Sequence, residues 1–397
     1  MRRAAYAAGA LLLITSATGC HGSADSATPS RGSASSGSTG AFPAPAADGN
    51  ALPASVAAGM QAALRTAVSS DIPGIEAAVV TDHGTWQGAA GVDGRGAAVQ
   101  PQAQMAVGSV SKTFTAAEVL HLAAEGKLNL DAPMSRYVHS PLVGNHATVR
   151  EALGMLAGLT DGHYLDRTQR ASARTPNARV SLDDAIAADT EKPGHAGQTQ
   201  SYSNVSFLLL ARVVEAVTQQ SYAAAVRADL LEPAILTRVA VQDSDKPIPP
   251  LAYPVDPSGN KPLTDGYLPD RYTASAAVGA GSVAATAHDE ALWGYNLYTG
   301  RVLPESLTAL MMKPQRAGSF SYGLGTVIFD PGKLGLDAPV VGHDGTVYHG
   351  NGGGIDGYRS ILLVIPSKHV SVAVTIDEVD DYAPTAPALA LLRYVMS

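Results

Sequence analysis

The stretch GSVSKTF, at residues 108–114, places a serine and a lysine three residues apart at the start of a helical pattern. That spacing puts Ser109 and Lys112 on one face of a helix, where free backbone N–H groups and the helix dipole favour a developing anion. Ser109 is a candidate nucleophile if Lys112 accepts its proton, which requires a lysine pKa well below about 10. The alternative is structural, with Ser109 as the N-cap of the helix.

A second candidate lies in SYSNVSF, at residues 201–207, just before an apolar helical pattern. Tyr202 and Asn204 flank one residue, so in an extended or turn conformation both side chains can point into the same cleft. A tyrosine can transfer a proton if cations lower its pKa, and an asparagine amide can hold a substrate carbonyl. The alternative is a helix N-cap formed by Ser203 or Asn204.

The third candidate is GHDGTVYHGNGGGIDGYRS, which runs from Gly342 to Ser360 after an apolar stretch. Its beginning suits the end of a strand, where Gly345 would let a ligand backbone approach closely and an extended substrate could add as a further strand. The alternatives are a phosphate cradle and a metal site held by His343 and His349. Nothing else in the sequence calls for a metal.

Strand patterns at both ends of the chain and helical patterns between them must position these residues. A helix is predicted over 52–70, a β-hairpin over 74–93 and a helix from Ser109 to about Gly126. Further helices are predicted in NVSFLLLARVVEAVTQQ, HDEALWGYNLYTG and PTAPALALLRYVM, and strands in FSYGLGTVIFD, APVVGHDG, YRSILLVIPS and HVSVAVTID.

This order predicts an α+β fold. An antiparallel sheet forms from residues 52–108 and 315–397 and is covered by helices, and a mainly helical insertion occupies about 109–314. The segments 160–200 and 242–272 are expected to be long loops, and they carry no pattern that identifies a ligand.

The composition narrows the function classes. A net charge of -8 over 397 residues does not suit nucleic-acid binding, and 46% hydrophobic residues are enough for a substantial core. Cys20 is the only cysteine, which excludes an internal disulfide and argues against a cysteine-ligated metal cluster.

The first twenty residues have the features of an export signal. Arg2 and Arg3 precede a short apolar stretch, and small residues lead to Cys20. These small residues resemble the lipobox of bacterial lipoproteins, in which the cysteine carries the lipid and holds the domain at a membrane surface. The alternative is cleavage and secretion. Residues 21–51 are rich in Ser, Gly, Ala and Pro and predict a disordered linker before a folded domain at 52–397.

The fragments SVSK, YSN and HDG, in this order, resemble the motifs of the serine β-lactamase and penicillin-binding-protein superfamily. The branch is the one that contains class C β-lactamases and D-alanyl-D-alanine carboxypeptidases. The resemblance covers about residues 55–395, including AVGSVSKTFTAAEVLHLAAEGKLNLDAPMSRYV, SAAVGAGSVAATAHDEALW and SYGLG. It implies a β-lactamase-like fold, with helices on both faces of the sheet.

The resemblance also implies acyl transfer. Ser109 would attack the carbonyl of a D-alanyl peptide, a β-lactam or an ester, and Lys112 and Tyr202 would share proton transfer. Asn204 would orient the substrate amide, and His343 would flank the strand that docks it.

The oxyanion hole of the family would comprise the backbone N–H groups of Ser109 and Thr346. No metal or cofactor is implied. The substrate is the expected partner, together with a membrane through the lipid on Cys20.

The sequence departs from the family pattern in two places. In GMLAGL, Met155 and Ala157 replace the polar residues of a segment like SHRSGL, which predicts altered packing with activity retained. In the third motif, the position six residues before the Gly-Tyr pair at 357–358 holds Asn351 instead of a histidine. Either His343 begins the motif and the hairpin is longer, or Asn351 takes its place. We favour His343, because the residue types of GHDGTV and their order match the family motif.

These features predict an exported D,D-carboxypeptidase-like serine hydrolase. Class C β-lactamase and esterase activities are alternatives within the family. A non-hydrolytic protein that captures cell-wall peptide or β-lactam is the alternative from another class.

Overall fold

A computed structural model describes residues 50–255, 266–316, 321–346, 357–377 and 384–396. The predicted leader, Cys20 and nearly all of the predicted linker lie outside these ranges, as do His349 and Asn351. Export and lipid attachment therefore stay predictions. No helix among the described residues is long and apolar enough to cross a membrane.

Strands from both ends of the chain form one six-stranded antiparallel sheet, as the sequence predicts. Its strand order is β2-β1-β9-β8-β7-β6. The N-terminal hairpin joins the C-terminal strands because β1 pairs with β9 along its length. The strands are β1 (Gly74–Thr81), β2 (Thr85–Gly91), β6 (Val327–Phe329), β7 (Val340–Thr346), β8 (Tyr358–Ile365) and β9 (Val370–Asp377).

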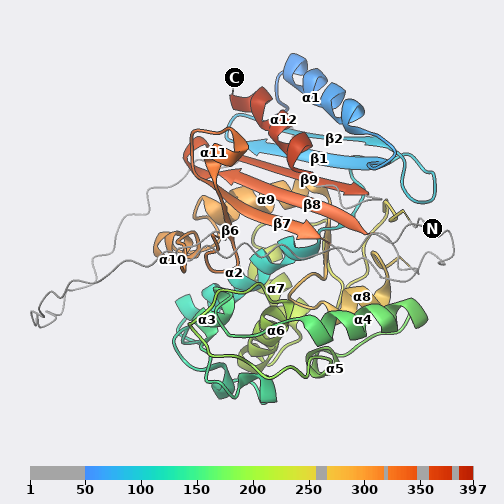
Figure 1. Cartoon of the computed structure of the whole chain (residues 1–397). Helices are drawn as coiled ribbons and strands as arrows, with labels where there is room; N and C mark the ends of the chain where they lie inside the picture. Colours follow the sequence, from blue (N-terminus) through green and yellow to red (C-terminus); the bar gives the residue numbers. More distant parts are fainter. Residues whose placement is uncertain (1–49, 256–265, 317–320, 347–356, 378–383, 397) are drawn as a thin grey trace, which may run out of the picture. The chain divides into compact units, whose positions relative to one another are not determined.

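Helices cover both faces of this sheet (Figure 1). On one face pack α1 (Ala54–Ala67) and α12 (Thr385–Met396), and on the other lies α9 (Ala287–Tyr298). Alternate residues of β8 divide between the two sides. Leu363 packs in the cluster with α1 and α12, and Leu362 packs in the cluster with α9. The sheet is therefore buried on both sides.

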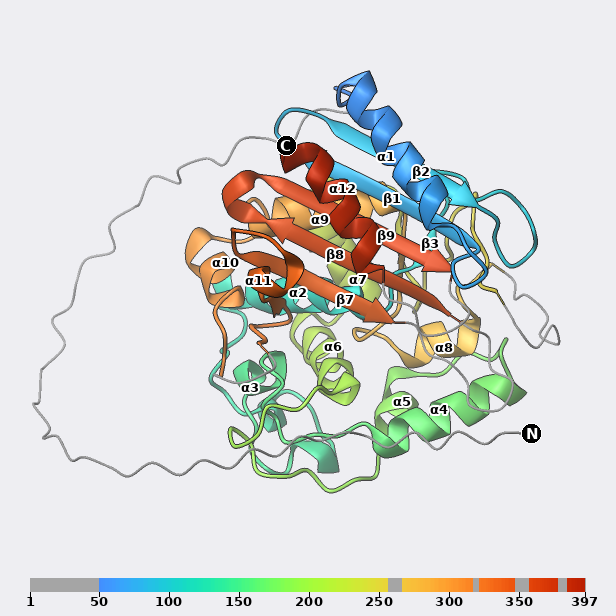
Figure 2. The ribbon, with the colours of Figure 1, turned by 45° about the horizontal axis from the view of Figure 1, so that its top comes forward.

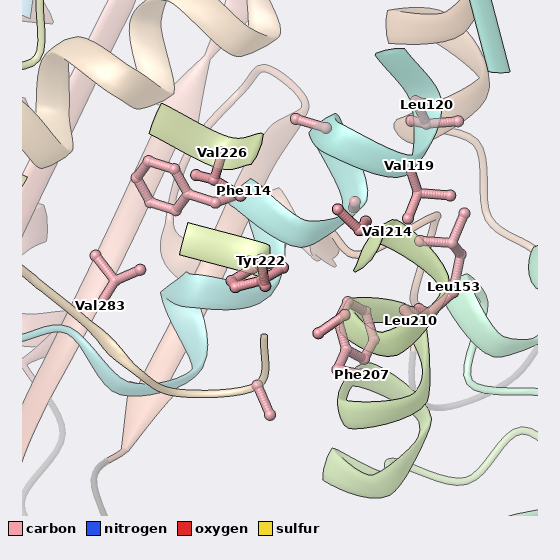
Figure 3. Close-up of a cluster of buried hydrophobic side chains, with 14 of the residues drawn as sticks. Phe114, Val119, Leu120, Leu153, Phe207, Leu210, Val214, Tyr222, Val226 and Val283 are labelled. Carbon is pink, nitrogen blue, oxygen red and sulfur yellow. The ribbon is translucent and has the colours of Figure 1, made fainter. Parts of the chain in front are cut away.

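The helical region is built around α2 (Ser111–Ala124) and α6 (Asn204–Thr218). Figure 3 shows side chains of both helices in one buried cluster, among them Val119 and Leu120 of α2 and Leu210 and Val214 of α6. Phe114 of α2 stacks on Trp293 of α9, with ring centroids 4.2 Å apart, which ties α2 to the helix that covers the sheet. The start of α2 is thus fixed between the sheet and the helical region.

The remaining helices lie around the sheet and the helical region (Figure 2). They are α3 (Val149–Leu153), α4 (Gly162–Arg174), α5 (Leu182–Ala187), α7 (Tyr222–Val226), α8 (Arg271–Ala276), α10 (Glu305–Met311) and α11 (Pro331–Leu334). Short 3-10 turns are η1 (Gly108–Val110), η2 (Met134–Arg136), η3 (Pro141–Val143) and η5 (Pro366–Lys368), and a π-helical turn is η4 (Arg227–Leu231).

One expectation about the middle of the chain is wrong. The segment 160–200 is not one long loop, because it contains α4 and α5. The structure also has a second, small sheet of order β3-β5-β4 that was not predicted, with β3 at Met105–Ala106, and with β4 at Val239–Val241 and β5 at Val283–Ala285 inside the mainly helical region. These strands have two or three residues, too few for a period-two pattern to show.

Candidate active site

Lys112 connects the first two motifs. It lies in the first turn of α2, and its Nζ donates hydrogen bonds to Ser109 Oγ (2.9 Å), Asn204 Oδ1 (2.7 Å) and the Ala280 carbonyl (2.8 Å). Ser109 sits in η1, and neither η1 nor α2 has a side-chain cap, so the N-cap alternative for Ser109 is wrong. The Ser109 hydroxyl instead faces the lysine amine.

Burial decides the protonation of Lys112. The side chain is fully buried, and this burial lowers the pKa of Lys112 to about 7, although the Asp161 carboxylate acts in the opposite direction. A large fraction of Lys112 is therefore neutral near pH 7. The chemical condition for a lysine that accepts the proton of Ser109 is met.

In the second motif, Ser203 caps a helix, as the structural alternative predicts, while Tyr202 and Asn204 face Ser109 and Lys112, as the functional alternative predicts. Ser203 is the N-cap of α6, and its Oγ accepts a hydrogen bond from the Ser206 N–H at 3.1 Å. Asn204, the first residue of α6, turns its Oδ1 to Lys112. The ring of Tyr202 lies 4.9 Å from Lys112 Nζ, and its hydroxyl shares a hydrogen bond with Ser109.

Tyr202 keeps its proton in this environment. Burial raises the pKa of Tyr202 above its ordinary value, and the hydrogen bond with Ser109 only partly opposes this effect. The residue as a whole is 37% exposed, so part of the ring faces solvent while the hydroxyl lies against Ser109. The condition that cations lower the pKa of the tyrosine is therefore not met. Tyr202 can relay a proton as a neutral hydroxyl.

Asp161 orients the second motif, and the sequence reasoning missed it. Its Oδ2 accepts hydrogen bonds from the Asn204 N–H (2.7 Å) and Asn204 Nδ2 (2.8 Å). Its Oδ1 accepts from Ser203 Oγ (3.0 Å) and the Val205 N–H (3.1 Å). Because Asp161 holds the Asn204 amide nitrogen, the amide oxygen must face Lys112. The available signal was weak: an Asp-Gly pair just after GMLAGLT.

Met155 forms hydrogen bonds with the backbone of the second motif. It is buried, its Sδ accepts a hydrogen bond from the Ser203 N–H at 3.3 Å, and its carbonyl accepts from the Ser201 N–H at 2.8 Å. Its backbone has a positive φ of 60°, which is unusual for a residue with a side chain. Ala157 is also buried, and its carbonyl accepts a hydrogen bond from Asn145 Nδ2 at 2.7 Å.

His343 is a neutral, fixed residue of β7. Its Nδ1 lies 2.8 Å from the Asp344 carbonyl, which can only accept, so Nδ1 carries the hydrogen. Its Nε2 then accepts from the Tyr322 hydroxyl at 3.2 Å. Burial, and then the charge of Lys112, lower the pKa of His343 to about 3. The His343 and Tyr202 ring centroids are 6.3 Å apart, so this register places a third-motif residue beside the second motif.

Gly345 is required for a different reason than the sequence suggested. A Cβ at this position would overlap the Val107 carbonyl and Ser360 Oγ. The glycine therefore admits the backbone of the protein itself, next to η1, and this contact brings β7 up to the nucleophile turn. Thr346 follows as the last residue of β7 and pairs with Arg359 of β8.

The end of β7 that passes the nucleophile has an unpaired edge. The short strand β6 pairs with β7 only from Val340 to Gly342. Over His343–Thr346, no described strand lies on that side, so backbone groups there are available to an extended ligand.

The described residues hold no group of three or more His, Cys, Asp or Glu side chains that could bind a metal ion. The metal alternative needs His349, which lies outside the described residues. Among the described residues, Lys112 contacts Ser109 and Asn204, and Tyr202 shares a hydrogen bond with Ser109.

This sheet, the helical region beside it and the serine-lysine-tyrosine cluster between them define serine hydrolases with the β-lactamase-like fold. The chain belongs to the Beta-lactamase family, whose model matches residues 39–394. Protein flp of Staphylococcus aureus (strain NCTC 8325 / PS 47) is 29% identical over 147 residues, which are 36% of this chain and 29% of flp. The matched segment is thus less than a third of that relative.

Two solved structures share the fold over their whole length. The D-stereospecific amidohydrolase from Streptomyces sp. has a TM-score of 0.68 and 24% identity, over 84% of this chain and 97% of that one. The D-amino acid amidase from Ochrobactrum anthropi SV3 complexed with L-phenylalanine has a TM-score of 0.72 and 17% identity, over 86% and 98%. At these identities the likeness shows the fold alone.

The register of the third motif can be tested by paired substitutions. His343→Ala is expected to lower kcat/KM about tenfold or more, because it removes the ring beside Tyr202 and leaves the buried Tyr322 hydroxyl without its acceptor. Asn351→Ala is expected to stay within about twofold of the wild type. Steady-state kinetics on one substrate compares the two. Impairment by the asparagine change alone would show that Asn351 begins the motif.

Proposed function

We propose that this protein is an extracytoplasmic acyl-transfer hydrolase that uses Ser109 as its nucleophile. The observation that carries the proposal is the contact of the buried Lys112 amine with the Ser109 hydroxyl, in an environment that lowers the pKa of Lys112 to about 7. A neutral amine beside a serine hydroxyl is a competent general base. The export signal that the sequence predicts supports action outside the cytoplasm.

The reaction has two steps, acylation of Ser109 and hydrolysis of the acyl-enzyme. Ser109 Oγ attacks the substrate carbonyl and gives its proton to Lys112, directly or through the Tyr202 hydroxyl. The Ser109 and Thr346 N–H groups would stabilise the oxyanion, and the leaving group takes the proton as its bond to the carbonyl carbon breaks. Water then attacks the Ser109 ester and gives a proton to the same base, and the base passes this proton to Ser109 Oγ as the ester C–O bond breaks and the acid is released.

The substrates we propose are D-alanyl peptides, β-lactams or related amides and esters. The HDG motif supports a carboxypeptidase-like reaction, since it resembles the motif of D-alanyl-D-alanine carboxypeptidases more than that of class C β-lactamases. A second candidate is hydrolysis of amino acid amides. It is favoured by the neutral state of His343 and by the two proteins that share the fold, a D-stereospecific amidohydrolase and a D-amino acid amidase.

The test is mass spectrometry of the purified protein after rapid quenching with three acyl donors: a p-nitrophenyl ester, D-alaninamide and a fluorescent penicillin. An adduct on the peptide that contains Ser109, followed by turnover of at least one donor, is the expected result. A stable adduct without turnover would favour a binding protein. The absence of both adduct and turnover with all three donors would reject the enzyme.

A further inference from the structure

A buried stripe of polar residues runs along α2 away from the active site. Lys112, Thr115 and Glu118 follow one another at intervals of three residues, so they lie along one side of the helix, and all three are buried. Neither Thr115 nor Glu118 has a role in the acyl transfer proposed for Ser109. Buried polar groups are held by hydrogen bonds, and those of Thr115 lead back to Lys112.

The hydroxyl of Thr115 holds the turn that supplies the third acceptor of Lys112. Thr115 Oγ1 donates to the Gly279 carbonyl at 2.6 Å, and Lys112 Nζ donates to the carbonyl of the next residue, Ala280, at 2.8 Å. Gly279 has a φ of +78°, and a Cβ there would come within 2.7 Å of the Phe207 carbonyl of α6. The turn therefore packs against α6, and both of its carbonyls bind side chains of α2.

Tyr222 of α7 completes a chain of hydrogen bonds. Its hydroxyl lies 2.6 Å from Thr115 Oγ1. A threonine hydroxyl has one hydrogen and the Gly279 carbonyl can only accept, so Tyr222 donates to Thr115 and Thr115 donates to the carbonyl. The Tyr222 side chain is fully buried, and its backbone N–H donates to Glu215 Oε1 of α6 at 3.2 Å. The start of this chain is thus fixed by the packed core.

The Ala280 carbonyl helps to aim the Lys112 amine at Ser109. The charged amine has three hydrogens for its three partners, whereas the neutral amine has two hydrogens and a lone pair. Asn204 Oδ1 and the Ala280 carbonyl can only accept, so they take the two hydrogens of the neutral amine. The lone pair is left for the Ser109 hydroxyl, which can donate. A displaced Ala280 carbonyl would remove one of the two contacts that set this direction.

We propose that Thr115 and Tyr222 are positioning residues of this site: their hydrogen-bond chain holds the turn whose carbonyl orients the Lys112 amine. The inference rests on the proposed function and adds two residues that act on it through Lys112. The chain is neutral, since burial raises the pKa of Tyr222 and its hydroxyl keeps its proton. The charged form of Lys112 needs the same carbonyl as an acceptor, so a looser turn lowers the pKa of Lys112 as well as the rate.

Other ionisable groups act on the two ends of the chain. In the described part of the protein, those around the Lys112 amine include Asp161, Tyr202 and His343. At the other end, Glu118 acts on Tyr222, and burial followed by the charge of Asp229 raises the pKa of Glu118 to about 8. Removal of the Thr115 or Tyr222 hydroxyl leaves all of these groups in place. A changed titration of Lys112 then reports the position of the turn.

The test removes one hydroxyl at a time. Thr115→Val is expected to lower kcat/KM about tenfold and to lower the midpoint of its rise with pH by about half a pH unit, a threefold loss of proton affinity at Lys112. Tyr222→Phe, one step further from the amine, should lower kcat/KM about threefold and move the midpoint in the same direction. Thr115→Ser keeps the hydroxyl and should stay within about twofold of the wild type, with an unchanged midpoint.

The double variant Thr115→Val/Tyr222→Phe tests whether the two residues form one chain. Because Tyr222 acts through Thr115, the double variant should lose about tenfold, as Thr115→Val does alone. A loss of about thirtyfold, the product of the two single effects, would show independent residues and overturn the inference. Thr299→Val is the matched control: Thr299 is buried, and its Oγ1 donates to the Tyr295 carbonyl at 2.6 Å. It should keep both the rate and the midpoint.

The titration of Lys112 is also measured without turnover, by carbon-13 NMR of protein labelled at the lysine Cε. The resonance that Lys112→Met lacks belongs to Lys112. A Lys112 midpoint that is the same in Thr115→Val and the wild type, or one that moves equally in Thr115→Ser, would overturn the inference. Tyr222→Phe carries the same measurement if Thr115→Val does not fold. If the midpoint falls as expected but no donor acylates Ser109 of the wild type, the proposed function fails and the positioning role stands.

Discussion

Ser109→Ala is expected to abolish acyl-enzyme formation and to lower kcat about 10⁴-fold or more. The Ser109 hydroxyl accepts a hydrogen bond from Lys112 and shares one with Tyr202, and no other described hydroxyl of a serine contacts the lysine amine. Its loss removes the nucleophile and leaves the rest of the site in place. The measurement is the mass of the quenched protein together with steady-state turnover of the best ester or amide.

The fold should survive this change, because Ser109 caps no helix. A melting temperature within a few degrees of the wild type is the check. Ser221→Ala is the matched control, since Ser221 is the N-cap of α7, and it should weaken stability slightly and leave turnover unchanged. Turnover of Ser109→Ala at the wild-type rate would refute the nucleophile assignment.

Lys112→Met is expected to lower kcat/KM about 10³-fold, since it removes the base and keeps the volume of the buried side chain. In the wild-type protein the base is the neutral amine. Because burial lowers the pKa of Lys112 to about 7, activity should rise with pH through about 7 and then level off. A pH-rate profile of kcat/KM measures this rise of activity with pH. The residual activity of Lys112→Met should not rise over the same pH range.

Lys127→Met is the control for the loss of a lysine. Lys127 is exposed and lies just after the end of α2, where its Nζ pairs with Glu125 Oε2 at 2.7 Å. An exposed ion pair of this kind contributes little, so the variant should keep both the rate and the pH profile. A wild-type rate that falls as the pH increases through 7 would contradict a neutral-lysine base.

The position of the site explains why these residues need one another. Ser109 lies in the turn η1 just before α2, and Lys112 lies in the first turn of α2. Asn204 begins α6, the second central helix of the helical region. Three hydrogen bonds of Lys112 join the turn before α2, the start of α6 and the turn after α8. The lysine is therefore a structural link as well as the proposed base.

Local features of the chain were predictable because short-range geometry fixes them. The separation of Ser109 and Lys112 by three residues sets both on one face at the start of a helix, and the structure shows the contact. The hairpin at 74–93 was predicted from two apolar runs separated by the turn residues 82–84, and the structure shows the two strands paired. The strand patterns near the C-terminus likewise correspond to paired strands. The strands β4 and β5 could not be found, because their stability comes from pairing with each other inside the helical region.

Contacts between distant segments were not predictable in the same way. Asp161 reaches Asn204 across 43 residues, and Tyr322 reaches His343 across 21. No local spacing rule connects such positions. The role of Gly345 was also assigned to a ligand, because the sequence does not show which backbone approaches a glycine.

The sequence by itself determined which residues are available for chemistry and in what order they occur, because residue type and helix or strand period are local properties. Only the tertiary structure decided their protonation. Burial lowers the pKa of Lys112 to about 7 and of His343 to about 3 and raises the pKa of Tyr202, against the expectation for the tyrosine. The physical reason is desolvation: the charged form of a group loses the water that stabilises it, and only the packed fold determines how much water is lost.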